Sequence, residues 1–492
     1  MTSRTCVTFC LLFGWSVTFA TNEELAVLPG LVIADVTVVS PERTAPLERA
    51  FVRIVDGRIA QVSQRELRAE TRLDGRGRFL VPGLIDSHMH VGGVPGMGAE
   101  HERRHPDLVS AYQVQQPLSY LYFGFTTVID LFGNPDDIGE WNAQGTRPDA
   151  YFCGGTPIPN GYPMVLFPEE VRYHAAPYFL YDARRPDSLP NHIEPERHTP
   201  EAVVQRMASD GAICVKAHHE PGFGMFRDLP TPTAEAVRAL VDAARAEGLP
   251  VILHANAKAS QEFAVETGVD ILAHGLWNGL HHDRADLTEE VIALLDLIVT
   301  DSIGYQPTFQ VLHGELDLFD DAYLDDPRLA DAYPEALLEW YRSDAAGWFR
   351  AQVGPGLSGP DAARIYGPIL HRLGQVVAHL ADGEARLLFG SDTPSAPTYA
   401  NPPGLNGLME MRRWVAAGVS EAQLFRALTL DNARAFGLDD EVGSIEVGKK
   451  AHLLLLGSNP LDGVEAYDAI DTLIFDGRPI ERARLSARWV AD

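Results

Sequence analysis

The stretch VPGLIDSHMHV, residues 81–91, decides how the rest of the chain is interpreted. It begins as an apolar run of the kind found in buried strands and ends in two histidines, His88 and His90. Side chains two positions apart on a strand lie on the same face, so both imidazoles can reach one metal ion. The stretch therefore predicts a buried strand with metal ligands at its C-terminal end.

The same pattern recurs along the chain. Further apolar, strand-like segments end in Lys216, His254, His274 and Asp392. Helical segments alternate with them, such as the amphipathic one for which Thr231 is the expected N-cap and Gly248 the stop signal. Repeated β-then-α units favour a parallel sheet, and polar groups at the C-terminal ends of several strands are typical of barrel enzymes. Periodicity alone fits a barrel or an open doubly wound sheet, but the gathered strand ends favour a barrel.

Both ends of the chain have a different character. Residues 21–80 and 441–492 read as short strands, with Asp56-Gly57 and Asp476-Gly477 as hairpin turns. Neither end has enough apolar surface to form a stable sheet alone, so we expect the two ends to pair. The predicted organisation is a barrel over residues 81–440 and one small composite β-sandwich made from residues 21–80 and 441–492.

Residues 1–20 have the features of a secretory signal peptide. Arg4 precedes the apolar run Cys6 to Val17, and Thr18-Phe19-Ala20 provides small residues for cleavage after Ala20. The apolar run is too short to span a bilayer. We expect a periplasmic or secreted protein without a membrane association after cleavage.

Net charge and cysteine content disfavour two classes of protein, nucleic-acid-binding proteins and disulfide-rich scaffolds. The formal net charge of −28 disfavours binding to nucleic acid, because an acidic surface repels a phosphate backbone. Two cysteines, Cys153 and Cys214, remain after cleavage, too few for a disulfide framework. Both lie in apolar, strand-like segments, which favours two buried free thiols over a disulfide.

Ordered motifs carry a family resemblance over essentially all of the mature chain. They read VPGLIDSHMHV, GFTTVIDL, VKAHHE, VILHANA, GVDILAHG, LLFGSD and TLDNARAFGLDDEVGSIEVGKKAHLLLL. In this order they resemble the metal-dependent amidohydrolase superfamily, most closely its imidazolonepropionase-like and prolidase-like branch. The resemblance implies a (β/α)8 barrel with a small composite β-sandwich, and one or two divalent metal ions, usually zinc.

The resemblance also assigns roles to the residues at the strand ends. His88, His90 and Asp392 would bind the buried metal ion, and His254 and His274 the more exposed one. Lys216 matches the lysine that the family carboxylates, and its carbamate would bridge the two ions. A bridging hydroxide would then be the nucleophile, with Asp392 passing its proton to the leaving amine.

The substrate is predicted more coarsely than the site. We expect hydrolysis of an amide bond in a small molecule, such as a dipeptide or an N-acyl amino acid. The alternative keeps the same site but cleaves a lactone, a cyclic amide or a phosphotriester. Tyr162, His219 and Lys258 lie just beyond strand ends and are candidate substrate contacts. The sequence leaves the oligomeric state open, a homo-oligomer included.

Two departures from the superfamily pattern bear on this choice. Ala257 stands where deaminases of the superfamily carry a glutamate, which counts against a purine or cytosine deaminase. Residues 217–224, AHHEPGFG, replace the Ser-Gly-rich loop that prolidase-like members tend to carry after the lysine. The preference of prolidase-like enzymes for particular amino acids in the substrate is therefore not assumed for this chain.

A second zinc pattern competes with the first. His101-Glu102-Arg103-Arg104-His105 matches the H-E-x-x-H motif of metalloproteases, which requires a stable helix and a third ligand. Glycines precede the motif, and Pro106 disfavours helical geometry at His105, so we predict a loop beside the mouth of the barrel. A non-catalytic barrel is the remaining alternative, and it is disfavoured because every ligand position is filled.

Overall fold

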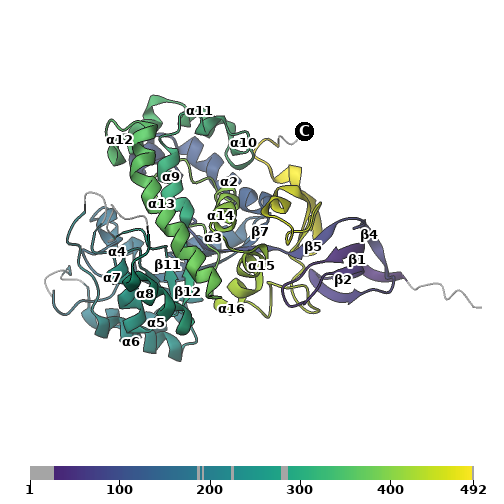
Figure 1. Ribbon diagram of the computed structural model, residues 1–492, viewed down its shortest axis with the longest axis horizontal. Coiled ribbons are helices and arrows are strands. Elements are labelled where there is room, and N and C mark those ends of the chain that lie inside the picture. Colours follow the sequence, from purple (N-terminus) through teal and green to yellow (C-terminus); the bar gives the residue numbers. More distant parts are fainter. Residues whose placement is uncertain (1–26, 186–188, 191–192, 223–225, 279–285, 490–492) are drawn as a thin grey trace, which may run out of the picture.

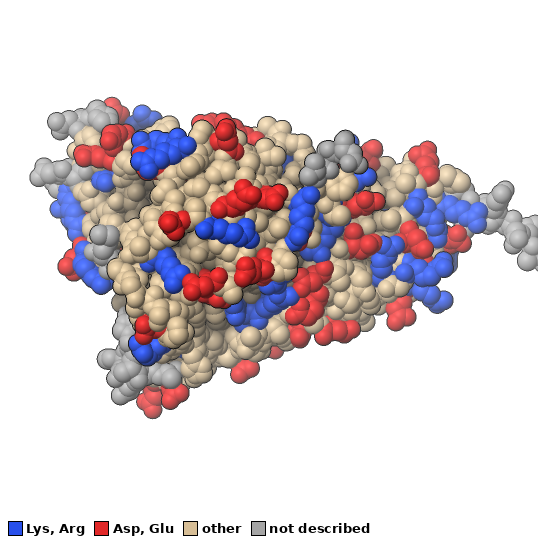
Figure 2. Space-filling model, turned by 90° about the horizontal axis from the view of Figure 1, so that it is seen from above, with Lys and Arg blue, Asp and Glu red and all other residues tan. Residues whose placement is uncertain are grey.

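The computed structural model describes residues 27–185, 189–190, 193–222, 226–278 and 286–489. The expected signal peptide, residues 1–20, lies outside the described residues. Within the described residues, no helix has both the length and the apolar character needed to cross a membrane. Figure 2 shows acidic and basic side chains interspersed over one face of the molecule, so the net negative charge does not form a single patch there.

The central sheet contains seven parallel strands that follow one another in chain order. They are β6 (Leu84–Met89), β7 (Phe125–Asp130), β8 (Asp149–Thr156), β9 (Cys214–His218), β10 (Val251–His254), β11 (Ile271–Ala273) and β12 (Gly304–Gln306). Most of their residues are buried on both faces, which explains the continuous apolar runs in the sequence.

Residues 386–393 close this sheet into a barrel. On one side, the Leu388 N–H donates to the Tyr305 carbonyl at 2.9 Å. On the other side, the Ser87 N–H donates to the Phe389 carbonyl at 3.2 Å, and the His90 N–H to the Thr393 carbonyl at 2.8 Å. This segment therefore acts as the eighth strand between β12 and β6, and the predicted (β/α)8 barrel is confirmed.

Helices cover the outside of the barrel (Figure 1). The larger ones are α2 (Pro106–Tyr122), α3 (Pro135–Ala143), α5 (Pro200–Ser209), α6 (Ala234–Ala246), α7 (Lys258–Thr267), α8 (Glu289–Thr300), α13 (Gly359–Asp382) and α14 (Leu405–Ala416). Short helices α4 (Arg172–Ala175), α15 (Glu421–Arg426) and α16 (Asn432–Ala435) complete the set around the strands. An insertion between β12 and α13 adds α9 (Phe309–Asp317), α10 (Leu329–Ala332), α11 (Glu335–Tyr341) and α12 (Trp348–Val353).

Helix α6 shows how the amphipathic pattern works, and also where it misleads. Its buried residues are Val237, Leu240, Val241 and Ala244, one face of the helix, as the sequence predicts. The N-cap, however, is Thr233, whose hydroxyl accepts from the Ala236 N–H at 3.0 Å. The expectation of Thr231 was wrong by two residues, because Thr233 also precedes the first apolar turn and can cap it equally well.

The two ends of the chain build one second sheet in the order β15-β14-β13-β5-β1-β2-β3, with β4 paired to β1. Its N-terminal strands are β1 (Val27–Val38), β2 (Leu47–Val55), β3 (Arg58–Ser63), β4 (Arg68–Asp74) and β5 (Phe79–Pro82). Its C-terminal strands are β13 (Leu453–Leu456), β14 (Ile470–Phe475) and β15 (Arg478–Glu481). The antiparallel pairing of β13 with β5 joins the ends, so the predicted β domain from both termini is observed.

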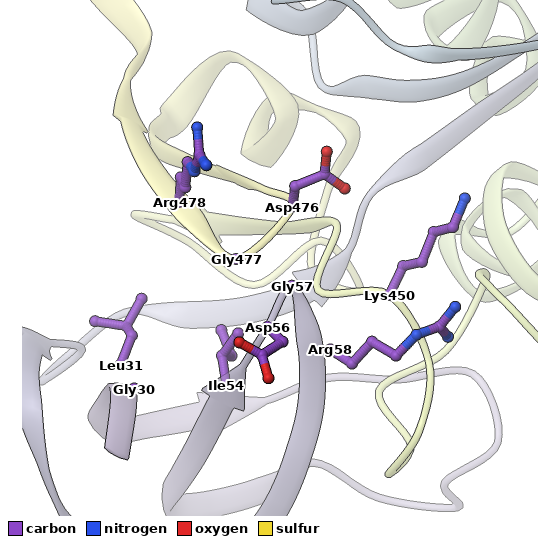
Figure 3. Close-up of a pocket in the computed structure, with 10 residues that line it drawn as sticks. All are labelled: Gly30, Leu31, Ile54, Asp56, Gly57, Arg58, Lys450, Asp476, Gly477 and Arg478. Carbon is purple, nitrogen blue, oxygen red and sulfur yellow. The ribbon is translucent and has the colours of Figure 1, made fainter.

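An open pocket lies between the two Asp-Gly turns of this β domain (Figure 3). Two of its three cationic residues form ion pairs: Arg58 contacts Glu441 at 2.8 Å, and Lys450 contacts Asp149 at 2.7 Å. Asp149 begins β8, so the pocket lies towards the N-terminal ends of the barrel strands. The histidines identified in the sequence lie at the opposite ends.

Cys153 and Cys214 form a disulfide between the neighbouring strands β8 and β9. Their Cα atoms are 4.5 Å apart, and both side chains are fully buried. The expectation of two free thiols is therefore wrong. The two cysteines are 61 residues apart in sequence, and only the strand register makes them direct neighbours.

Gly390 lies where the eighth strand packs against His88 of β6. A Cβ atom at Gly390 would lie 2.5 Å from the Cβ of His88, which is closer than two such atoms approach. We expect Gly390→Ala to lower the free energy of unfolding by about 1–3 kcal/mol, because overpacking shifts the backbone. Urea unfolding of the metal-free protein measures this change.

The matched control is Gly374→Ala, in the middle of α13, where an added Cβ meets no atom within 4 Å. That substitution should stabilise the protein by up to about 1 kcal/mol through helix propensity. Equal unfolding midpoints for the two variants would contradict the close approach of the two strands.

Candidate metal centre

Histidines from several strands converge on the carboxylate of Asp392. His88 and His90, at the end of β6, each place Nε2 3.1 Å from Asp392 Oδ1. His274, just after β11, places Nδ1 3.7 Å from Asp392 Oδ2. The ligand atoms of His88, His274 and Asp392 all lie within 4.8 Å of one another, a spacing that one metal ion can bridge. The ring of His254, at the end of β10, lies 4.4 Å from that of His274.

The backbone at two of these residues adopts an uncommon conformation. Asp392 has φ +52° and His274 has φ +79°, both in the left-handed region that favours glycine. Such positions cost about 1–3 kcal/mol each and persist where the surroundings hold them. The Asp392 N–H donates to the His88 carbonyl at 2.6 Å, so the eighth strand itself fixes this carboxylate against β6.

Asp86, on β6, joins the eighth strand to β6 through hydrogen bonds to Ser391 and His88. Its carboxylate accepts from the Ser391 N–H at 2.9 Å, from the Ser391 hydroxyl at 2.5 Å and from the His88 N–H at 3.2 Å. Burial raises its pKa to about 7 against these hydrogen bonds. Asp86 was not predicted as a site residue, although a charged residue inside an apolar strand is a usable signal.

Charges within the site favour bound cations. Burial opposes ionisation of Asp392, but His88, His90 and His274 hold its pKa well below the usual value, so it is a carboxylate at neutral pH. Burial lowers the pKa of His88 to about 4, which leaves a neutral imidazole. Burial also disfavours the charged form of His90, yet its hydrogen bonds to Asp130 and Asp392 raise its pKa to about 9. A metal ion can take the place of that proton.

Lys216, on β9, is buried near the same carboxylate. It is 3% exposed, and its Nζ has no hydrogen-bond partner among the described residues. Burial lowers the pKa of this amine to about 7, although the charge of Asp392 opposes the change. A buried amine without a partner is costly unless another group satisfies it. The donors at this site therefore fit a metal centre that includes Lys216.

Each of three histidines has a second partner that orients its ring. Asp130 accepts from His90 Nδ1 at 3.1 Å and also from the Val91 and Phe132 N–H groups. Thr308 Oγ1 lies 3.1 Å from His274 Nδ1. Glu220 Oε2 lies 3.3 Å from His254 Nε2. Such outer partners fix which ring nitrogen is free to bind a metal.

The three candidate substrate contacts occupy different environments. The ring of Tyr162 lies 4.7 Å from that of His254 and therefore borders the site. His219 Nδ1 is 2.9 Å from Ser260 Oγ, and its ring stacks on Phe263. Lys258 is engaged in ion pairs with Glu262 and Glu290, at 2.6 and 3.5 Å. Tyr162 contacts a ligand histidine through its ring, whereas His219 does so through its backbone N–H, which donates to the His254 carbonyl at 3.1 Å. His218, which was not predicted as a site residue, also contacts Tyr162 and His254 through its buried ring.

The His101–His105 motif is separate from this centre. Residues Ala99–Arg104 form the short helix α1, so the expected loop was wrong, although α1 ends before His105 as Pro106 indicates. The His101 ring packs against Trp348 and Trp340 of the insertion, with centroids 5.2 and 5.6 Å away. Glu102 accepts from the Val94 N–H at 2.9 Å. Packing against the insertion, which the local sequence does not reveal, holds this turn in helical form.

Comparison with known families agrees with the geometry. A model of the Amidohydrolase family matches residues 79–301 and 373–480, more than half of the chain. A dihydroorotase from Methanothermobacter thermautotrophicus is 31% identical over 80 residues. That match spans only 16% of this chain and 16% of the dihydroorotase.

Solved structures resemble the whole molecule. An Xaa-Pro dipeptidase with bound methionine is 20% identical, with a TM-score of 0.61 over 92% of this chain and 99% of its own. Molinate hydrolase is 18% identical, with a TM-score of 0.64 over 94% and 96%. Ochratoxinase from A. niger is 18% identical, with a TM-score of 0.62 over 93% and 96%. At these identities the likeness establishes the shared fold.

Metal content separates the two zinc patterns. We expect His274→Ala and Asp392→Asn to weaken metal binding by more than the ~10–100-fold that loss of an outer partner costs, because each removes a ligand. The double variant His101→Ala/His105→Ala should keep the wild-type content, because those rings pack on tryptophans. Elemental analysis after dialysis measures both. Metal loss in the double variant alone would assign the ion to the other motif.

Proposed function

Because the chain belongs to the amidohydrolase family, we propose that it is a metal-dependent hydrolase that cleaves an amide C–N bond in a small molecule. The observation that carries this proposal is the convergence of His88, His90 and His274 on an ionised, buried Asp392. All of these groups lie at the C-terminal ends of the barrel strands, where barrel enzymes place their active sites.

The donor set suits one or two divalent ions. His88, His90 and Asp392 would hold the first, and His254 and His274 the second, with Lys216 between them. Nitrogen and carboxylate oxygen donors in this number are typical of zinc. When bound, such ions lower the pKa of a water molecule and polarise the substrate carbonyl.

Lys216 would contribute as a carbamate. Its neutral Nζ adds to the carbon of carbon dioxide and releases a proton, which gives a carbamate whose single negative charge is shared by two oxygens. Burial favours this reaction because it lowers the pKa of the amine to about 7, so the neutral, nucleophilic form is accessible. The carbamate also removes the repulsion that an ammonium would exert on two cations.

Asp392 would move the proton. Its carboxylate stays ionised at neutral pH, and Oδ1 and Oδ2 face different histidines. It can accept a proton from the attacking water and release it to the leaving amine. Addition of water to the amide then yields a carboxylic acid and an amine.

For the substrate we propose a dipeptide or an N-acyl amino acid. The support is the similarity in fold to an Xaa-Pro dipeptidase and to a prolidase complexed with N-methylphosphonate-L-proline. We further propose that the protein is periplasmic or secreted. The signal-like residues 1–20 and the Cys153–Cys214 disulfide support this location, because structural disulfides persist in oxidising compartments.

A substrate panel tests the proposed bond. Metal-reconstituted protein should release amine from dipeptides or N-acyl amino acids, and Asp392→Asn should lower kcat/KM by at least about 10²–10⁴-fold, because it removes both a ligand and the proton carrier. His219→Ala should change kcat/KM little, since its ring stacks on Phe263. Turnover confined to lactones, cyclic amides or phosphotriesters would replace the amide in this proposal.

Carboxylation of Lys216 has its own test. Metal-free protein reconstituted with zinc in carbon-dioxide-free buffer should regain less activity and bind less metal than protein reconstituted with bicarbonate. Lys216→Gln, which cannot form a carbamate, should be insensitive to bicarbonate. Equal recovery of wild-type protein with and without bicarbonate would count against the carbamate.

A further inference from the structure

The segment after β9 carries a buried carboxylate that the family pattern does not anticipate. Glu220 is only 2% exposed, in the stretch where this chain departs from the usual Ser-Gly-rich loop. Charged side chains are almost never buried to this extent unless they are paired. Its partners therefore indicate its role.

Both oxygens of Glu220 are engaged. Oε1 accepts from the Gly222 N–H at 2.8 Å, and this fixes the carboxylate to its own loop. Oε2 lies 3.3 Å from Nε2 of His254. Asn256 Nδ2 also lies 3.3 Å from Nε2 of His254, so two polar groups enclose this nitrogen.

The contacts of Nε2 decide which nitrogen of the ring is left for a ligand. Glu220 Oε2 and Asn256 Nδ2 both engage Nε2, which leaves Nδ1 as the nitrogen of His254 that can face a metal ion. The ring stays in place because it also contacts Tyr162 and His274.

His90 provides a comparison within the same site. Asp130 engages Nδ1 of His90 at 3.1 Å and leaves Nε2, which lies 3.1 Å from Asp392. Two carboxylates thus select opposite ring nitrogens in two histidines, one assigned to each metal position. A carboxylate on the outer nitrogen also makes the imidazole a stronger donor.

We propose that Glu220 is a positioning residue that presents Nδ1 of His254 to the second metal ion and sets the affinity for that ion. This inference rests on the metal centre of the proposed function but not on its substrate. It also predicts that the two metal positions respond independently, because Asp130 and Glu220 act on different ligands.

Metal titration of Glu220→Gln tests the proposal without any substrate. Gln keeps the shape of the side chain and an acceptor for the Gly222 N–H but loses the charge. We expect metal-free wild type to bind two cobalt ions in competition with a chelator. In Glu220→Gln the second ion should bind about 10–100-fold more weakly, with the first unchanged.

The matched control is Glu262→Gln on α7, which removes a carboxylate that pairs with Lys258 instead. It should bind both ions as wild type does. Combining Glu220→Gln with His254→Ala should add no further loss to that of His254→Ala alone, because Glu220 acts through this ring. If Glu220→Gln does not fold, Glu220→Asp, which keeps the charge but shortens the side chain, is measured by the same criteria.

Wild-type affinity for both ions in the Glu220 variant would overturn the proposal. Equal weakening of both ions, or a further loss on top of His254→Ala, would also overturn it and assign Glu220 to loop structure alone. Failure of every amide substrate would refute the proposed function but would leave this titration unaffected.

Discussion

Closure of the barrel by residues 386–393 is the constraint on which the site depends. This segment hydrogen-bonds to β12 on one side and to β6 on the other, although it is the last of the eight strands in the chain. The closure places Asp392 beside His88 and His90, which are about three hundred residues earlier in the sequence. Gly390 lets the eighth strand pack closely against β6. Asp86 accepts hydrogen bonds from the Ser391 N–H and hydroxyl and so fixes the register of the two strands.

The pKa values at the site are shifted because many ionisable groups are buried close together. Burial alone would neutralise Asp392, yet its pKa stays low because three imidazoles surround it. Asp130 and Glu220 extend the arrangement outward, since each accepts from a ring nitrogen and is itself fixed by backbone N–H groups. The strained backbone at His274 and Asp392 is tolerated because this network holds it.

The sequence was informative wherever a local pattern carried the signal. Apolar runs that end in His88, His254 or Asp392 give both the strand and the functional end, because parallel strands bring their C-terminal ends to one edge. Features set by tertiary contacts were harder to predict. The Cys153–Cys214 pairing depends on strand register, the helical turn before His105 depends on two tryptophans of a distant insertion, and the role of Glu220 depends on its contact with His254.

The pairing of β13 with β5 has a consequence for how the chain folds. The edge of β5 finds its partner only after all the barrel strands have been made, because β13 follows them in the chain. Contacts of such long sequence separation form slowly, and an unpaired edge is prone to intermolecular pairing in the meantime. A chain truncated before β13 would therefore keep the edge of β5 unpaired and open to other strands.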